Sequence, residues 1–223
     1  MAIYEAMTGP SRPLALEERA ITGARLSSPS AARNSQAIAQ ALAGLLPQGA
    51  RVLEIASGTG EHALACVAAR PDLTWTPSDP DAASRASADD WAREAGGRIA
   101  PALAIDVTSP GWERGLDAPD AVFCANMIHI APWQAAEGLF DGASQLLGPG
   151  GAVHLYGPFR EGEATAPSNL DFDASLKARD PRWGVRERTE VEALAARCGF
   201  APAGRIAMPA NNLLLSFARE AGA

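Results

Sequence analysis

The chain has 223 residues, of which 47% are hydrophobic and 20% charged, a composition typical of one globular domain with a sizeable core. Its formal net charge of -7 opposes general binding to a polyanion, so we expect no nucleic-acid partner. There is no apolar run of about 18 residues and no signal-peptide pattern, which predicts a cytoplasmic protein that does not enter a membrane. We expect a monomer or homodimer.

Three cysteines are spread along the chain and form no Cys-x-x-Cys pair: Cys66, Cys124 and Cys198. Each lies in an apolar stretch, which predicts buried, reduced thiols and agrees with a cytoplasmic location. The three histidines show no ligand spacing with these cysteines, so we expect no bound metal.

Residues 1–28 contain Gly-Pro-Ser-Arg-Pro and no sustained hydrophobic period. We therefore predict an N-terminal arm, followed by a single domain that spans residues 29–223. A helix is predicted from Pro29, with Ser30 as its cap, because apolar residues then recur at helical spacing. Pro47 ends this helix.

Strands and helices alternate through the next hundred residues. The predicted strands span residues 51–56, 74–79, 101–106, 121–126 and 152–156, and the helices between them include one ending at Arg70 and others over 81–94 and 132–147. Parallel strands need long, usually helical crossovers, so this alternation predicts a parallel sheet covered on both faces.

The C-terminal part departs from this alternation. We predict an irregular segment from about 157 to 183, with a lid-like insertion over about 160–186, and then a capping box at 189–192 that opens a helix to Cys198. The strand-like runs 201–208 and 212–218 are joined by a turn too short for a parallel crossover, so they form an antiparallel hairpin. The predicted fold class is α/β, with a doubly wound, Rossmann-like, mostly parallel seven-stranded sheet that ends in this hairpin.

A glycine-containing loop, Glu54-Ile-Ala-Ser-Gly-Thr-Gly60, follows the first strand. Glycines let the backbone turn sharply and approach a ligand, and a doubly wound sheet binds ligands at the carboxyl ends of its strands. Asp79 follows Gly60 by 19 residues and ends the second strand, where a carboxylate can accept hydrogen bonds from both hydroxyls of a ribose. Glu54 suits a cationic amino group, such as that of S-adenosylmethionine.

Two cofactors fit this loop, because residues 58–63 also match the G-x-G-x-x-G/A fingerprint of dinucleotide sites. The terminal hairpin and a third acidic strand end, Asp106, favour S-adenosylmethionine. The Tyr-x-x-x-Lys pair of short-chain dehydrogenases is absent, since Arg160 stands four residues after Tyr156. A tight turn with Asp79 as a helix cap is the structural alternative.

Several runs carry a more specific resemblance: residues 54–62, 78–81, 124–133, 156–159, 179–186 and 208–213. Over residues 24–219 the chain resembles a poorly characterised methyltransferase-like family, found in bacteria and animals and long labelled a domain of unknown function. The resemblance implies a class I methyltransferase fold, S-adenosylmethionine as cofactor and methyl transfer to an unidentified small molecule.

One residue departs from the general class I pattern. Ala56 stands where the first glycine of the loop usually lies. Alanine favours ordinary negative φ angles, so we expect the loop to enter its turn at Ser57 or Gly58 instead.

The cofactor is expected at the strand ends and against the first helix. The predicted cofactor-binding residues are Arg33, Asn34, Glu54, Ala56, Ser57, Gly58, Thr59, Gly60, Asp79, Pro80, Asp106, Val107, Asn126 and Met127. Adenine is expected beside Asp106 and Val107, and the methionyl part beside Asn126 and Met127. An exposed helical arginine at position 33 and a local cap at position 106 are the structural alternatives.

His129 and Tyr156 are the predicted catalytic residues, since they lie near the expected position of the methyl group. A histidine titrates near neutrality and can act as a general base, although it can equally be a packed residue with one satisfied nitrogen. The predicted substrate contacts are Trp133, Asn169, Arg179 and Trp183. Trp183 can instead anchor a loop to the core.

Methyl transfer displaces a carbon already activated by positive sulfur, so it needs alignment more than a catalytic triad. The function predicted from the sequence is an S-adenosylmethionine-dependent methyltransferase acting on a small molecule. The alternatives are a non-catalytic S-adenosylmethionine-binding or assembly protein, and an NAD-dependent oxidoreductase.

Overall fold

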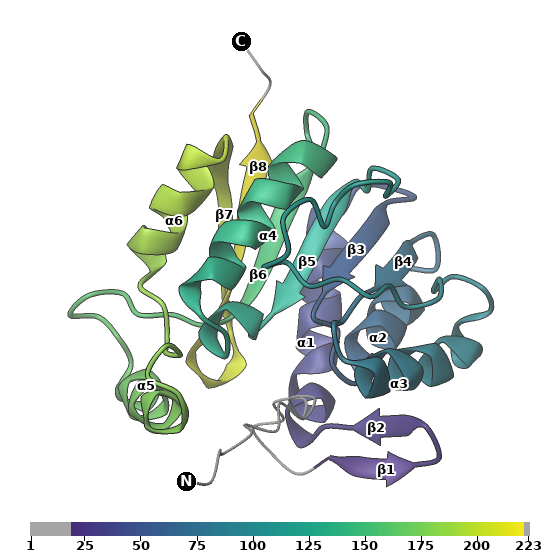
Figure 1. The fold of residues 1–223 in the computed structure, drawn as a ribbon, viewed down its shortest axis with the longest axis horizontal. Coiled ribbons are helices and arrows are strands. Elements are labelled where there is room, and N and C mark those ends of the chain that lie inside the picture. The colour runs from purple at the N-terminus through teal and green to yellow at the C-terminus, as the bar shows by residue number, and fades with distance from the viewer. Residues whose placement is uncertain (1–18, 221–223) are drawn as a thin grey trace, which may run out of the picture.

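The computed structural model describes residues 19–220, and within them a six-stranded sheet lies between two layers of helices (Figure 1). The strand order is β4-β3-β5-β6-β8-β7, with β4, β3, β5 and β6 parallel and the last two pairings antiparallel. The strands are β3 (Arg51–Ile55), β4 (Thr74–Pro77), β5 (Ala121–Ala125), β6 (Ala152–Pro158), β7 (Phe200–Met208) and β8 (Asn212–Arg219). The mixed α/β class and the terminal hairpin are thereby confirmed.

Alternating side chains bury both faces of this sheet. In β3, Leu53 and Ile55 pack toward α4 (Trp133–Leu146) and α6 (Arg188–Arg197), whereas Val52 packs toward α1 (Pro29–Leu45) and α2 (Glu61–Ala69). The helix α3 (Ala82–Ala92) adjoins α2. None of the helices within residues 19–220 combines the length and apolarity needed to cross a bilayer.

The predicted strand over residues 101–106 is wrong, and with it the count of seven strands. This stretch runs beside β4 and makes only isolated contacts with it. Leu103 N–H donates to the Pro77 carbonyl at 2.9 Å, and the Leu103 carbonyl accepts from Asp79 N–H at 3.0 Å. Pro101 has no N–H to donate. The segment therefore occupies the place of an edge strand without forming a ladder.

Two predicted helix caps are also wrong. Ser28, not Ser30, caps α1, because its hydroxyl accepts from Ala31 N–H at 3.3 Å. The helix α6 begins at Arg188, one residue before the predicted capping Thr189, and its cap position is Glu187, which makes no side-chain cap bond. Thr189 therefore lies inside the first turn and cannot form a capping box.

The segment predicted as irregular contains a helix, α5 (Pro167–Arg179), which stands away from the sheet (Figure 1). It has a small core of its own, made by Leu176, Trp183 and Val185. Its sequence lacks a strong apolar stripe, so periodicity could not indicate it.

Part of the predicted N-terminal arm forms a hairpin of β1 (Ala20–Thr22) and β2 (Arg25–Ser27). It docks on α3, where the Arg25 guanidinium lies 4.0 Å from the ring centre of Trp91 and 2.9 Å from the Asp90 carboxylate. Residues 1–18 of the predicted arm lie outside the described residues.

The three cysteines are free thiols. Cys66 and Cys124 are buried as predicted, and burial raises the pKa of Cys124 to about 12. Cys198 is only partly buried, because it follows α6 at the edge of the core.

Candidate active site

A cavity of about 790 Å³ opens at the carboxyl ends of β3, β5 and β6, a volume typical of ligand sites. We call its two parts the loop end and the α5 end. The loop end is lined by Arg19, which precedes the first strand of the N-terminal hairpin, by the start of α1 and by the β3–α2 loop, including Arg33, Ala56, Ser57, Gly58 and Thr59. The α5 end is lined by the ends of β5 and β6, by α5 and by the β7–β8 turn, including Asn126, His129, Tyr156, Asn169, Phe172 and Asn212.

The β3–α2 loop enters its turn one residue earlier than predicted. Ala56 has a φ of 56°, in the left-handed region, so the expectation that the turn begins at Ser57 or Gly58 is wrong. Ser57 fixes this conformation, because its N–H donates to the Ser78 carbonyl at 2.8 Å and its hydroxyl accepts from Ser78 N–H at 3.0 Å. An alanine is thus held where a glycine would adopt the angle freely.

Gly60 supports the loop and does not line the cavity. Its φ is 90°, and a Cβ at this position would lie 2.5 Å from the Cα of Ala88 in α3. Glycine is therefore needed here for the close approach of α3 to the start of α2.

Asp79 binds the β3–α2 loop through its side chain. Its carboxylate accepts Gly58 N–H at 3.0 Å and Asp81 N–H at 2.9 Å. Burial raises the pKa of the Asp79 carboxyl, while these two hydrogen bonds and the charge of Arg19 oppose that effect. Asp81, not Asp79, caps α3 by accepting Ser84 N–H at 2.7 Å, which removes the helix-cap alternative for Asp79.

Glu54 is 1% exposed and lies behind the cavity wall. Its carboxylate accepts from Trp75 Nε1 at 2.9 Å and lies 3.7 Å from His62 Nδ1. The other ring nitrogen of His62 is 2.9 Å from Asn34 Oδ1, and Asn34 in turn donates a hydrogen bond to the hydroxyl of Tyr156. A chain of polar contacts thus connects buried Glu54 to a hydroxyl at the cavity.

His129 is fully buried from solvent and lines the cavity. Its Nδ1 accepts from Arg186 N–H at 3.2 Å, and its Nε2 has no hydrogen-bond partner among the described residues. Burial, and then the charge of Arg186, lower the pKa of this imidazole to about 3. A neutral ring whose Nδ1 accepts carries its proton on Nε2, so His129 presents a donor.

Other predicted site residues lie elsewhere. Asp106 is exposed and accepts from Thr108 N–H at 2.9 Å within its own turn, and no helix follows it. Trp183 belongs to the small core beneath α5. The predicted residues that do not line the cavity are Glu54, Gly60, Asp79, Pro80, Asp106, Val107, Met127, Trp133, Arg179 and Trp183. Val107 and Met127 are core residues, and Trp133 lies beside Arg186.

The cavity also contains residues to which the sequence analysis assigned no role. Asn212 is the first residue of β8, and it belongs to the run 208–213 that carried the family resemblance. Arg19 comes from the stretch predicted as an arm, which gave no signal of its own. Its guanidinium would lie 3.8 Å from a Cβ at Gly58, so it borders the loop.

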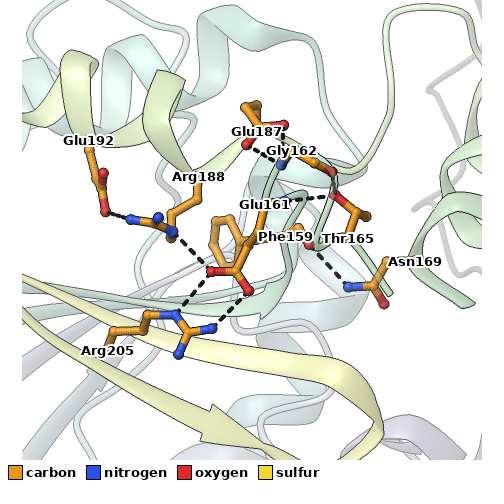
Figure 2. A network of polar contacts seen from close by, with 9 residues as sticks. All are labelled: Phe159, Glu161, Gly162, Thr165, Asn169, Glu187, Arg188, Glu192 and Arg205. Atoms are coloured by element: carbon orange, nitrogen blue, oxygen red, sulfur yellow. Dashed lines mark hydrogen bonds and ion pairs between the residues drawn. The ribbon is translucent and has the colours of Figure 1, made fainter. Parts of the chain in front are cut away.

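The connection from β6 to α5 is held by a polar network, shown in Figure 2. The Glu161 carboxylate pairs with Arg188 at 3.1 Å and with Arg205 at 2.8 Å, and Arg188 also pairs with Glu192. Asn169, at the start of α5, donates from Nδ2 to the Phe159 carbonyl at 3.1 Å. These bonds tie the base of α5 to α6, β6 and β7, and so position one wall of the cavity.

This sheet order, with a cavity at the carboxyl ends of its parallel strands, is the fold of class I methyltransferases, and several solved structures share it. An O-methyltransferase family protein from Burkholderia thailandensis has a TM-score of 0.74 at 20% identity, over 87% of this chain and 58% of that one. CalO1, a methyltransferase in calicheamicin biosynthesis with S-adenosylhomocysteine bound, has a TM-score of 0.71 at 17% identity, over 85% of this chain and 54% of that one. An O-methyltransferase family 2 protein from Planctomyces limnophilus in complex with apigenin has a TM-score of 0.71 at 19% identity, over 85% of this chain and 60% of that one.

The chain thus spans less than two thirds of each of these proteins, and at such identities the likeness shows the fold alone. The model of a family described as a protein of unknown function, DUF938, matches residues 25–219, and the chain belongs to this family. The family and the methyltransferase-like fold that the sequence resemblance implied are therefore confirmed.

Proposed function

We propose that this protein is an S-adenosylmethionine-dependent methyltransferase that acts on a small molecule. The observation that carries the proposal is a single cavity with a tightly turned, glycine-containing loop at one end and two polar rings, His129 and Tyr156, at the other. A cofactor at the loop end would therefore face an acceptor at the α5 end. The solved structures with this fold include an O-methyltransferase family protein and the S-adenosylmethionine-dependent methyltransferase SibL, which supports the same function.

The loop end fits a nucleoside cofactor. Left-handed backbone at Ala56 and Gly58 turns the chain sharply where it lines the cavity, and Gly58 has no side chain to block an approach. We propose that residues 56–59 contact the cofactor, that Asp79 accepts from its ribose hydroxyls, and that Arg33 and Asn126 border its methionyl part. Each Asp79 oxygen accepts one backbone N–H and keeps further lone-pair capacity for a hydroxyl.

Bound S-adenosylmethionine supplies a methyl carbon activated by positive sulfur. The protein's own contribution is alignment and exclusion of water, which can account for a large part of the rate. Tyr156 is fixed by Asn34, and His129 by Arg186, so both rings have set orientations. We propose that α5 and its connections form the lid-like wall that closes the acceptor end.

His129 and Tyr156 line the cavity, which favours an enzyme over a non-catalytic S-adenosylmethionine-binding protein. Calorimetry with S-adenosylhomocysteine and with NAD tests the proposal against a dinucleotide enzyme. We expect S-adenosylhomocysteine to bind and NAD not to bind. If S-adenosylhomocysteine shows no binding at about 1 mM, a level that detects even weak sites, the proposal is wrong.

A further inference from the structure

We propose that the α5 end of the cavity binds its acceptor as a carboxylate, through the Nε2–H of His129 and the hydroxyl of Tyr156, and that the product is a methyl ester. This inference rests on the proposed methyltransferase function. It concerns only the chemical class of the acceptor and the roles of two residues.

The first observation is the unpaired donor on His129. A buried N–H without a partner costs about 1–3 kcal/mol, and such groups are rare in folded proteins. Here the imidazole is fully buried, its Nδ1 is occupied by Arg186 N–H, and its Nε2 has no partner within residues 19–220. Because His129 is one of the residues that line the cavity, a bound ligand that brings an acceptor atom against Nε2 would remove this penalty.

The second observation is the glycine beside this donor. A Cβ on Gly157 would lie 2.6 Å from His129 Nε2 and 3.2 Å from Asn126 Oδ1. Any larger residue at position 157 would therefore collide with the imidazole. The absence of a side chain lets the His129 ring pack directly against β6, the strand that also carries Tyr156.

Tyr156 supplies the second donor. Its hydroxyl oxygen accepts a hydrogen bond from Asn34, so its own hydrogen is left to donate. Asn34 is oriented by His62, whose Nε2 lies 2.9 Å from Asn34 Oδ1. The amide oxygen therefore faces His62 and the amide nitrogen faces Tyr156.

The third observation is the charge of the lining. Among the described residues that line the cavity, none carries a carboxyl group, whereas Arg19 and Arg33 add positive charge at the loop end. This contrasts with the net charge of -7 for the whole chain. The residues of the lining thus carry positive and no negative charge, although the protein as a whole is acidic.

His129 cannot act as a general base, because it is neutral and its acceptor nitrogen is already occupied. The other histidine of the lining, His62, has its Nε2 2.9 Å from Asn34 Oδ1 and its Nδ1 3.7 Å from the Glu54 carboxylate, so both of its nitrogens face protein groups and neither faces a methyl acceptor. The acceptor must therefore arrive without a proton on the attacking atom, and a carboxylate does so at neutral pH because its pKa is about 4. A carboxylate also only accepts hydrogen bonds, which matches two donors.

The reaction balances without a proton. One carboxylate oxygen is held by the two donors, and the other attacks the methyl carbon of S-adenosylmethionine. An oxygen–carbon bond forms as the carbon–sulfur bond breaks, and the electron pair of that bond goes to sulfur. The products are a neutral methyl ester and S-adenosylhomocysteine.

The test uses methyl-labelled S-adenosylmethionine with a panel of small aromatic and aliphatic carboxylic acids, each paired with its alcohol or phenol and its amine. We expect label on the acids alone, and mild alkali should release it as volatile methanol, because esters hydrolyse while ethers and N-methyl groups do not. Label that is stable to alkali overturns the proposal. Failure to bind S-adenosylhomocysteine would instead contradict the proposed methyltransferase function.

Ligand binding gives a readout independent of turnover. In the complex with S-adenosylhomocysteine, a carboxylic acid from the panel should shift the Nε2–H proton signal of His129 in ¹⁵N-labelled protein. If none of the acids shifts this signal and none is labelled, the proposal is wrong.

Two substitutions distinguish loss of the hydrogen-bond donor from disruption of the fold. His129→Asn keeps an acceptor for Arg186 N–H but ends short of the cavity, whereas His129→Gln extends an N–H toward the position of Nε2. Acid affinity should fall about tenfold or more in His129→Asn and stay within about threefold in His129→Gln, as expected for one hydrogen bond to a charged group. Gly157→Ala, which keeps the His129 side chain but displaces it through a Cβ 2.6 Å from Nε2, should weaken acid binding as well. Unchanged acid affinity in both His129→Asn and Gly157→Ala would overturn the role of the donor.

Discussion

Ala56 adopts a backbone conformation that alanine disfavours. Left-handed angles cost an L-residue with a Cβ about 1–2 kcal/mol, and such strain persists where the surrounding structure determines the conformation. Two hydrogen bonds between Ser57 and Ser78 do this here. The loop is thus held open at the cavity by the pairing of the residues that follow β3 and β4.

Ala56→Gly should therefore raise the free energy of unfolding. Relief of strain, about 1–2 kcal/mol, exceeds the extra entropy of glycine in the unfolded chain, about 0.4–1 kcal/mol, so we expect a gain of up to about 1 kcal/mol. Urea unfolding measures it. Ala68→Gly, at an exposed position in α2, is the control and should lose about 1 kcal/mol. A loss at position 56 equal to that at position 68 would show that Ala56 is not strained.

Asp79→Ala should weaken the binding of S-adenosylhomocysteine. Two hydrogen bonds from ribose hydroxyls to a carboxylate are lost, and Gly58 N–H loses its acceptor, so we expect at least about 1.5 kcal/mol. Calorimetry measures the difference. Asp106→Ala, in an exposed turn outside the cavity, should change the affinity less. Unchanged affinity in Asp79→Ala would contradict the ribose role.

At the scale of elements, α5 depends on its anchoring more than on its own helix-forming pattern. Only Asn169, Asp173 and Leu176 of this helix are buried, and its base is held through Glu161 (Figure 2). Single surface ion pairs contribute little to stability, whereas networks of them contribute more. Glu161 is the central member of this network, because its carboxylate pairs with both Arg188 and Arg205. The position of the α5 end of the cavity thus depends on this polar network.

Glu161→Gln should weaken this polar network while leaving the sheet intact. We expect faster amide hydrogen exchange over residues 159–170 and a loss of about 1 kcal/mol in stability, with S-adenosylhomocysteine affinity unchanged. Arg182→Gln, which breaks an exposed pair with Asp180, is the matched control and should leave exchange over this range unaltered. Exchange that is equally slow in both variants would show that the network does not hold α5.

The elements differed in how far the sequence predicted them. Strands β3, β5 and β6 are apolar runs buried on both faces, so their pattern does not depend on tertiary detail. The helix α5 was missed because a small core that includes Trp183, four residues beyond its end, stabilises it. Residues 101–106 look like a strand locally, yet they make only isolated contacts with β4.

The site was predictable in the same uneven way. The loop at residues 56–59 and the residues Asn126, His129, Tyr156 and Asn169 do line one cavity, because strand ends in a parallel sheet meet at one edge. The left-handed angle of Ala56 and the tautomer of His129 depend on hydrogen bonds from distant residues, Ser78 and Arg186. No local pattern encodes such bonds.

At the scale of the whole molecule, two buried histidines make stability depend on pH. Burial lowers the pKa of His129 to about 3, helped by the charge of Arg186, and that of His154, which contacts Ser216, to about 4. The unfolded chain, with histidine pKa near 6.5, binds more protons below that pH. Stability from these groups is therefore present above about pH 6.5 and is lost as the pH falls.

Between about pH 6.5 and 5 the free energy of unfolding should fall by about 1.6 kcal/mol for each histidine, roughly 3 kcal/mol together. Urea unfolding across this range measures the slope. His154→Gln should halve it. Asp79 has the opposite effect, because a carboxyl group with a raised pKa stabilises the folded state as the pH falls, and it therefore offsets part of this loss at the acid end of the range. Stability that is constant over this range would contradict the neutral, buried state of both rings.

The most direct measurement of the central claim is a crystal structure of the protein grown with S-adenosylhomocysteine. The account predicts the ligand in the cavity at the ends of β3, β5 and β6, against residues 56–59 and Asn126 and with Asp79 on its ribose. The space beside His129 and Tyr156 should stay open for an acceptor. Ligand bound elsewhere, or filling the α5 end and leaving the loop uncontacted, would contradict the account.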